Sequence, residues 1–74
     1  MVVGLVSVLA ANIRALRSQK GMTQQQLANR CGLSVSYISM LEHGQRQPTL
    51  DTLELLSSVL GLPPLLLLEQ AMGA

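Results

Sequence analysis

Residues 23–44 read TQQQLANRCGLSVSYISMLEHG, and this stretch decides the fold of the chain. Thr23, with Gln26 three residues later, has the pattern of a capping box, and Ser34 is a second candidate for a helix N-cap. Gly32 suits the left-handed conformation at which the first of two short helices ends. Two short helices joined by about three residues around a glycine predict a helix-turn-helix over residues 23–44.

The rest of the chain predicts further helices and no strand. Apolar residues recur at helical spacing before the motif at Leu9, Ile13 and Leu16, and after it at Leu53, Leu56 and Leu60. Thr49 is an N-cap candidate, and Pro63 and Pro64 stand where a last helix would begin. The sequence therefore predicts one all-α domain over residues 1–74, with five helices over residues 5–20, 24–31, 35–43, 50–60 and 64–72.

Length and composition argue against an enzyme. A chain of 74 residues forms one domain with a small core, which leaves little room for a substrate cleft. Cys31 is the only cysteine, so an intrachain disulfide is excluded, and it is expected to be a core residue. His43 is expected to interact with the negative end of a helix dipole. One histidine and one cysteine do not form a metal or nucleophile site, so no metal or other cofactor is predicted.

Neither apolar stretch has the properties of a targeting or membrane segment. Residues 1–11 lack the positive region that opens a signal peptide, because the first basic residue is Arg14. Residues 62–68 are far fewer than the roughly 18 needed to span a bilayer. With a free thiol and no export signal, the chain is expected to be cytoplasmic and to have no membrane contact.

The net charge of +1 conceals an uneven distribution along the chain. Residues 12–48 contain five Lys or Arg residues and Glu42 as the single acid, a net charge of +4. Residues 49–74 contain three acidic residues and no basic one, a net charge of −3. The basic segment coincides with the helix-turn-helix, which favours a polyanionic partner for that half.

Residues 22–50 read MTQQQLANRCGLSVSYISMLEHGQRQPTL and resemble the lambda-repressor-like family of DNA-binding domains, also called the Cro/repressor or Xre type. The likeness extends over about residues 12–62, and the size of the chain resembles the controller proteins of restriction-modification systems. The resemblance implies a bacterial or phage transcriptional regulator that binds palindromic double-stranded operator DNA as a homodimer. It also implies a repressor or autoregulator.

The same resemblance assigns roles to individual residues. Base edges in the major groove would be contacted by Val35, Ser36, Ser39 and Met40. Phosphates would be contacted by Gln24, Ser34, Tyr37, Arg46, Gln47 and Thr49. The side-chain amide of Gln24 would also brace the start of the recognition helix. Arg17 and Glu42 would form an ion pair between the first helix and the end of the third.

Two departures from the family pattern qualify these roles. No Gln, Arg or Asn stands between Ser34 and Met40, so direct base readout is expected to be modest and DNA shape to matter more. Activators of this family commonly have acidic residues on the second helix for contact with RNA polymerase. Residues 24–30 contain none, which favours repression.

Sixteen leucines exceed what a core of this size can bury. Large exposed apolar patches mark interfaces, and a symmetric contact between two copies would join two helix-turn-helix motifs. A dimerisation region over about residues 55–72 is therefore predicted, with these contact residues: Leu55, Leu62, Leu65, Leu66 and Leu68. Two alternatives stay open: an antitoxin-type regulator whose leucine-rich face binds a partner protein, and a nucleic-acid binder without sequence preference.

Overall fold

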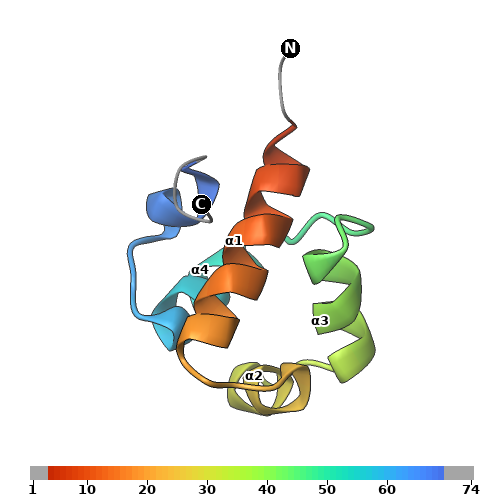
Figure 1. Cartoon of the computed structure of the whole chain (residues 1–74). Helices are drawn as coiled ribbons and strands as arrows, with labels where there is room; N and C mark the ends of the chain where they lie inside the picture. Colours follow the sequence, from red (N-terminus) through yellow and green to blue (C-terminus); the bar gives the residue numbers. More distant parts are fainter. Residues whose placement is uncertain (1–3, 70–74) are drawn as a thin grey trace.

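The computed structural model describes residues 4–69 and contains four α-helices and one short 3-10 helix. The helices are α1 (Leu5–Gln19), α2 (Gln24–Cys31), α3 (Val35–Glu42), α4 (Leu50–Leu60) and the 3-10 helix η1 (Pro64–Leu68). The described range contains no strand, so the all-α prediction is confirmed. α1 runs through the middle of the molecule and packs against α3 on one side and η1 on the other (Figure 1).

The predicted fifth α-helix over residues 64–72 is wrong for the part that can be compared. η1 ends at Leu68 and Glu69 is extended, with φ −80° and ψ 127°, while residues 70–72 lie outside the described residues. A buried side chain of α1 holds this segment: Asn12 Nδ2 donates to the carbonyl oxygens of Leu67 at 2.7 Å and Glu69 at 2.9 Å. This amide takes a carbonyl that an α-helix would pair four residues further along the chain.

The predicted helix ends and starts are confirmed to within one residue for α1 to α4. Thr23 and Gln26 form the complete capping box of α2, and the Ser34 hydroxyl accepts the backbone N–H of Tyr37 at the start of α3. Gly32 has φ 66° and ends α2 in the left-handed region. These caps fix the turn between α2 and α3 without any long-range contact.

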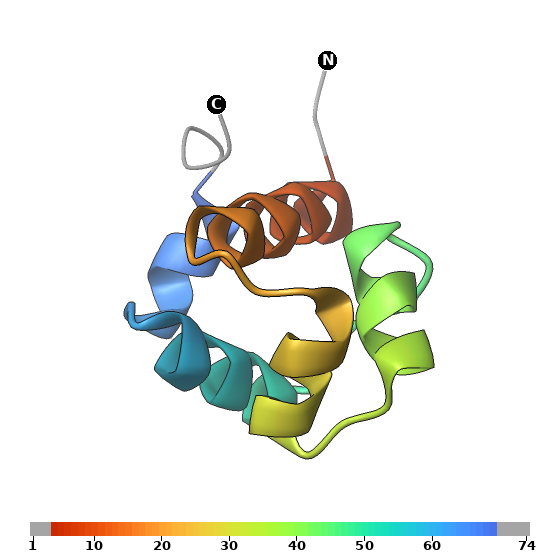
Figure 2. The same cartoon turned by 60° about the horizontal axis from the view of Figure 1, so that its bottom comes forward.

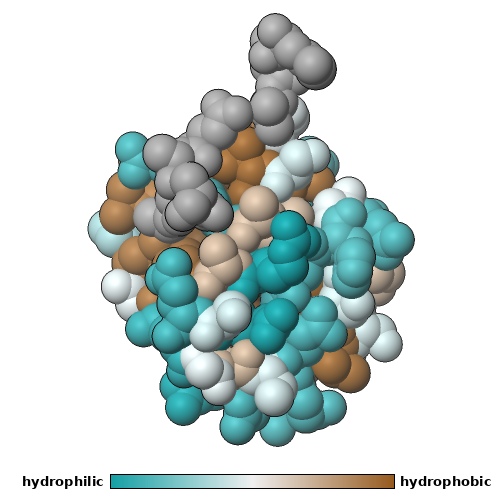
Figure 3. Space-filling model, viewed as in Figure 1, coloured by the Kyte–Doolittle hydropathy of each residue, from teal (hydrophilic) through white to brown (hydrophobic). Residues whose placement is uncertain are grey.

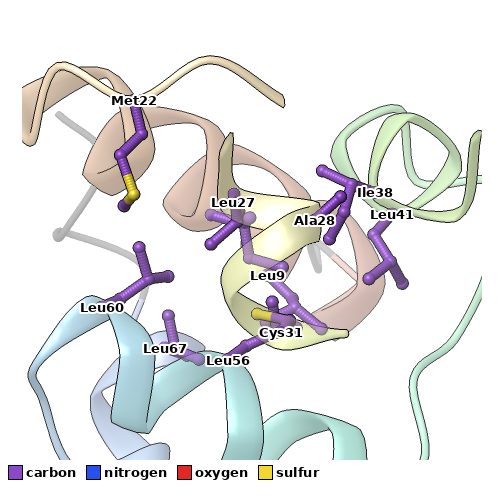
Figure 4. Packing of buried hydrophobic residues seen from close by; sticks show 11 residues of the cluster. Leu9, Met22, Leu27, Ala28, Cys31, Ile38, Leu41, Leu56, Leu60 and Leu67 are labelled. Atoms are coloured by element: carbon purple, nitrogen blue, oxygen red, sulfur yellow. The ribbon is translucent and has the colours of Figure 1, made fainter. Parts of the chain in front are cut away.

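All five elements contribute to one hydrophobic core. Figure 2 shows them arranged around a common centre, and Figure 4 shows buried side chains of every element pointing into it. Leu53, expected to be buried, is only half-buried. Cys31 lies in the core as a free thiol. The core cluster consists of Leu9, Ile13, Met22, Leu27, Ala28, Cys31, Ile38, Leu41, Leu56, Leu60 and Leu67.

Candidate nucleic-acid interface

The outer face of α3 is small and polar, whereas its inner face is fully buried. Ile38 and Leu41 are buried in the core. The four residues predicted to contact bases lie at spacings of one and four along the helix, so they share the opposite face. Val35 and Ser36 are exposed, and Ser39 and Met40 are half-buried. The hydroxyl of Ser36 has no hydrogen-bond partner among residues 4–69, which leaves it free for an external partner.

A buried carboxylate fixes the orientation of α3. Glu42, the last residue of the helix, is 1% exposed. Arg17 of α1 donates from Nε to Glu42 Oε2 at 2.6 Å and from Nη2 to Oε1 at 3.0 Å. These hydrogen bonds raise the pKa of the Arg17 guanidinium above its ordinary value, so the guanidinium stays protonated. A third Arg17 bond, from Nη1 to the Met22 carbonyl at 2.8 Å, ties in the turn before α2.

Gln24 joins this network, and the expectation for its side chain is wrong in one respect. Its Nε2 donates to Glu42 Oε1 at 3.0 Å, so the amide braces the end of the recognition helix and not its start. The reason is electrostatic, because a carboxylate is a stronger hydrogen-bond acceptor than a neutral group. The backbone N–H of Gln24, at the first residue of α2, stays available for a phosphate.

Ser34 and Thr49 use their hydroxyl oxygens to cap their own helices. The Thr49 hydroxyl accepts the backbone N–H of Thr52 at 3.1 Å and donates to the Thr52 hydroxyl at 3.0 Å. The donors left for a phosphate at α3 and α4 are therefore the unpaired N–H groups of their first turns. At α4 the exposed Asp51 already places a negative charge in that turn, which makes it the weaker of the two anion positions.

The loop between α3 and α4 brings Arg46 back onto the recognition helix. Gly44 turns the chain with φ 70°, and the backbone N–H of Gln45 donates to the Met40 carbonyl at 2.9 Å. The guanidinium carbon of Arg46 then lies 5.6 Å from the ring centroid of Tyr37. Two residues predicted to contact phosphate are thus neighbours, and Gln47 follows, exposed, on the same loop.

The remaining basic residues add to the positive electrostatic potential but form no second cluster on α3. Arg14 donates from Nη1 to the main-chain carbonyl of Glu42 at 2.7 Å and so closes the C-terminal end of α3. Lys20 and Arg30 line a shallow polar hollow between α2 and the turn that precedes it. Since Arg17 is paired with Glu42, Arg46 is the cation placed next to the outer face of the recognition helix.

Sequence reasoning missed two residues that matter for this arrangement. Arg14 holds the last carbonyl of α3, and Asn12 holds the carbonyls of η1. A detectable signal existed for Asn12, since it is a single amide between the apolar residues 8–11 and Ile13 and lies on the face that packs. Arg14 had no comparable signal, because its partner is a main-chain oxygen.

The leucines predicted to form an interface lie at different depths. Leu65 is 78% exposed and Leu55 is exposed, whereas Leu62, Leu66 and Leu68 are half-buried. Figure 3 shows apolar side chains gathered on the side where Figure 1 places η1, and polar side chains below, where α2 lies.

A groove extends this apolar surface toward the loop that carries Arg46. It has a volume of about 330 Å³ and is lined by Leu5, Val6, Leu9, Gln47, Pro48, Leu50, Leu53 and Leu68. Leu50, at 81% exposed, and Leu5, at 62%, were absent from the predicted set. Helical spacing could not have revealed their exposure, because Leu5 precedes Leu9 by four residues and Leu50 precedes Leu53 by three, which places each beside the apolar stripe of its helix.

The described part of the chain has neither a membrane-spanning helix nor a metal-ligand cluster. No helix within residues 4–69 is long and apolar enough to cross a bilayer. Within the same range, no three His, Cys, Asp or Glu side chains gather closely enough to hold a metal ion.

A model of the helix-turn-helix family matches residues 13–67. This range contains α2, α3 and the loop with Arg46, and it covers most of the chain. The chain belongs to the lambda-repressor-like helix-turn-helix family. Members of this family are DNA-binding transcriptional regulators rather than enzymes, and the face built by α3 has the form that such a regulator requires.

Individual members of the helix-turn-helix family are similar over most of their length. An uncharacterised HTH-type transcriptional regulator, y4dJ of Sinorhizobium fredii, is 43% identical over 73% of this chain and 70% of its own. The control protein C.BamHI of Bacillus amyloliquefaciens is 41% identical over 77% of this chain and 72% of its own. Other regulators that match are longer, and the matching part is 35–54% of their length.

The fold also matches a solved helix-turn-helix protein bound to DNA. The structure is that of the restriction-modification controller protein C.Esp1396I, as a tetramer in complex with its natural 35 base-pair operator. It superposes on 89% of this chain and 87% of its own with a TM-score of 0.78, at 33% identity.

Proposed function

We propose that this protein binds palindromic operator DNA as a homodimer and represses transcription, including that of its own gene. The observation that carries the proposal is the two-sided α3, with Ile38 and Leu41 in the core and the small, polar face outward. An α-helix with its side chains is about 10–12 Å wide, and the major groove of B-DNA is about 12 Å wide. The relatives named as control proteins support the regulatory role.

The outer face of α3 is proposed to read bases with two hydroxyls and one aliphatic group. Ser36 and Ser39 can donate to or accept from several base edges, and Val35 can pack against a thymine methyl group. None of these contacts is bidentate, so a single protomer discriminates weakly. Two recognition helices placed about 34 Å apart would read two half-sites and double the contacts.

Phosphates are proposed to be held by helix starts and by Arg46. The first turns of α2 and α3 present unpaired backbone N–H groups at Gln24 and Ser34, where the helix dipole favours an anion. Arg46 adds a full positive charge from the loop. Gln47 follows Arg46, exposed, on the same loop, while Thr49 contributes through the first turn of α4.

A second copy of the chain is proposed to cover the apolar surface that runs from η1 to the groove. Leu68 lines the groove and belongs to the predicted interface, so it connects the two parts. Gln47 and Pro48 also line the groove, directly after Arg46. A copy seated there would bring two Arg46 loops together near the centre of a palindrome. The exposed leucines at positions 50 and 65 give this contact its apolar area.

Repression is proposed because α2 offers no acidic residue to RNA polymerase. Its sequence is QQQLANRC, with no acid in the first turn. A reporter gene placed behind the protein's own upstream region should be expressed less when the protein is supplied. Increased expression would contradict the proposed sign of regulation.

The DNA-binding proposal is tested by selecting bound fragments from a genomic library and titrating the selected operator. Arg46→Ala should weaken binding to every sequence and lower the salt slope by about one per lost phosphate contact. Ser36→Ala with Ser39→Ala should change the preferred sequence. The matched control is Ser58→Ala, an exposed serine of α4, which should do neither. A double serine variant with unchanged operator and affinity would show that α3 does not read the bases.

The dimer is tested by light scattering on two variants that place a charge on the apolar surface. Leu50→Glu lies in the groove and Leu65→Glu lies on η1, and both side chains are exposed, so each variant should fold. We expect monomers with weak operator affinity, whereas Ser58→Glu should stay dimeric. Dimers that survive both leucine changes would overturn the proposed interface.

A further inference from the structure

The only aromatic ring of the chain lies under a cation of the DNA-facing loop. Tyr37 is the single Phe, Trp or Tyr in 74 residues, and the Arg46 guanidinium carbon lies 5.6 Å from its centroid. A cation within about 6 Å of a ring centroid is attracted by the negative face of the ring. Arginine also stacks with its plane on a ring, which leaves the N–H edge free to bind another group.

The two partners differ in how firmly they are held. Tyr37 is half-buried and packs against the hydrophobic core, and its backbone N–H donates to the Ser34 hydroxyl at 3.1 Å. Arg46 is exposed and follows the last hydrogen-bonded backbone group of the turn, the N–H of Gln45. Within the described residues, the backbone N–H groups of Arg46 and Gln47 have no protein acceptor. The ring is therefore the more firmly held partner, and the exposed Arg46 side chain lies over it.

We infer that Tyr37 is a positioning residue for Arg46, and that its ring rather than its hydroxyl is what DNA binding needs. The ring holds the guanidinium beside α3 before DNA arrives, so that an operator phosphate meets a cation already oriented. A long side chain that is already ordered loses less conformational entropy on binding. The smaller entropy cost makes binding tighter. The inference rests on the proposed DNA-binding function.

This role differs from a direct phosphate contact by the Tyr37 hydroxyl, and two substitutions separate them. Tyr37→Phe removes the hydroxyl and keeps the ring, whereas Tyr37→Leu removes the ring and keeps an apolar side chain against the core. Arg46→Ala removes the cation. The double variant Tyr37→Leu, Arg46→Ala then shows whether the ring acts through Arg46 or by itself.

The experiment measures the operator dissociation constants of these four variants and the wild type at several salt concentrations. Tyr37→Phe should stay within about twofold of the wild type. Tyr37→Leu should lose about two- to fivefold per protomer, which multiplies to about 4- to 25-fold for two protomers. In the Arg46→Ala background the same change should have no further effect. An equal loss in Tyr37→Phe and Tyr37→Leu, or a Tyr37→Leu loss that persists without Arg46, would overturn the inference.

A measurement on the free protein keeps the inference separate from the proposed function. The ring current of Tyr37 should shift the NMR signals of the Arg46 Cδ protons upfield in the wild type and in Tyr37→Phe. Unshifted Arg46 signals in both would contradict the stack whatever the DNA data show. A stacked Arg46 in a protein that binds no operator would instead contradict the proposed function. Circular dichroism of Tyr37→Leu, compared with the wild type, verifies that the variant is folded.

Discussion

Two halves of the molecule differ in how their side chains are partnered. The first half consists of α2, α3 and the loop to Thr49. The second half consists of α4, η1 and the first turn of α1. In the first half the buried charge of Glu42 is paired with Arg17 and Gln24, and the exposed face is small and polar. In the second half Leu50 and Leu65 are largely exposed. In the first half, the buried charge finds its partners within one chain, and the exposed face is polar enough to contact water or phosphate. The second leaves apolar surface that a second chain can cover.

α1 joins the two halves through one buried polar group on each side. Arg17 reaches Glu42 in the DNA-facing half, and Asn12 reaches the carbonyls of η1 in the leucine-rich half. Under the proposed function, reading DNA and pairing copies are therefore separable tasks. A substitution that breaks the Arg17–Glu42 pair should therefore affect mainly the first half, and a substitution of Asn12 should affect mainly the second half.

The largest expected effect comes from removing the charge that anchors the DNA-facing half. Glu42→Ala leaves Arg17 without its carboxylate and should lower the free energy of unfolding by about 3 kcal/mol, because a broken buried ion pair leaves an uncompensated charge. For a domain of this size the melting temperature should fall by about 12 °C or more. Thermal unfolding followed by circular dichroism measures it. The control Glu54→Ala removes an exposed carboxylate and should change stability by less than about 0.5 kcal/mol.

The next effect concerns the anchor of the leucine-rich half. Asn12→Ala leaves two carbonyls without their donor and should cost about 2 kcal/mol, the penalty of unsatisfied buried polar groups. At low temperature, where the variant stays folded, it should lose dimerisation while keeping the Arg17–Glu42 pair. Light scattering and urea unfolding test both points, with Asn29→Ala, an exposed amide, as the control. A stable dimer in Asn12→Ala would mean that η1 does not help to form the interface.

How much of this could be foreseen from the sequence also differs between the halves. The helix-turn-helix was predictable because its signals are local: the capping box at Thr23, the N-cap at Ser34 and the positive φ of Gly32 each act within four residues. The form of the last helix was not predictable from local signals, because its Leu67 carbonyl is bound by Asn12, 55 residues away in sequence. Leu67 lies in the core, but the 3-10 geometry of the residues around it has no signature in their apolar pattern.

The candidate site shows the same division between local and distant causes. The outer face of α3 follows from helical periodicity alone, since its core residues Ile38 and Leu41 are three apart. The bond from Gln24 to Glu42 and the stack of Arg46 on Tyr37 require the loop and three helices to be in place. Periodicity carries no information about such contacts.

A smaller effect is expected from the cap that starts the recognition helix. Ser34→Ala removes the acceptor for the Tyr37 backbone N–H and should cost about 1 kcal/mol. The melting temperature should fall by about 4–8 °C, and dimerisation should be unaffected. Ser34→Asp keeps a capping oxygen and should restore stability, while its negative charge weakens DNA binding. If Ser34→Asp is as unstable as Ser34→Ala, the hydroxyl does not act as a cap.

The smallest effect concerns Cys31, which lies in the core that both halves share. Burial raises the pKa of its thiol, so the folded state holds the proton more tightly than the unfolded state. The free energy of unfolding is unaffected below the thiol pKa of the unfolded chain, about 8.5, and falls as pH rises above it. Urea unfolding at pH 7 and pH 10 should show a larger decrease for the wild type than for Cys31→Ala. Equal decreases would mean that the thiol is not protected by burial.

The separation of the two halves is tested most directly by titrating the protein with two duplexes of equal length, one holding the whole selected palindrome and one holding a single half-site. Two protomers should bind the palindrome, at least about a hundredfold more tightly than the half-site, because the leucine-rich halves make the second binding step intramolecular. Leu50→Glu should bind both duplexes with the same low affinity. If instead one wild-type protomer binds each duplex, and with equal affinity, the proposal that one half reads DNA and the other half joins two protomers would be contradicted.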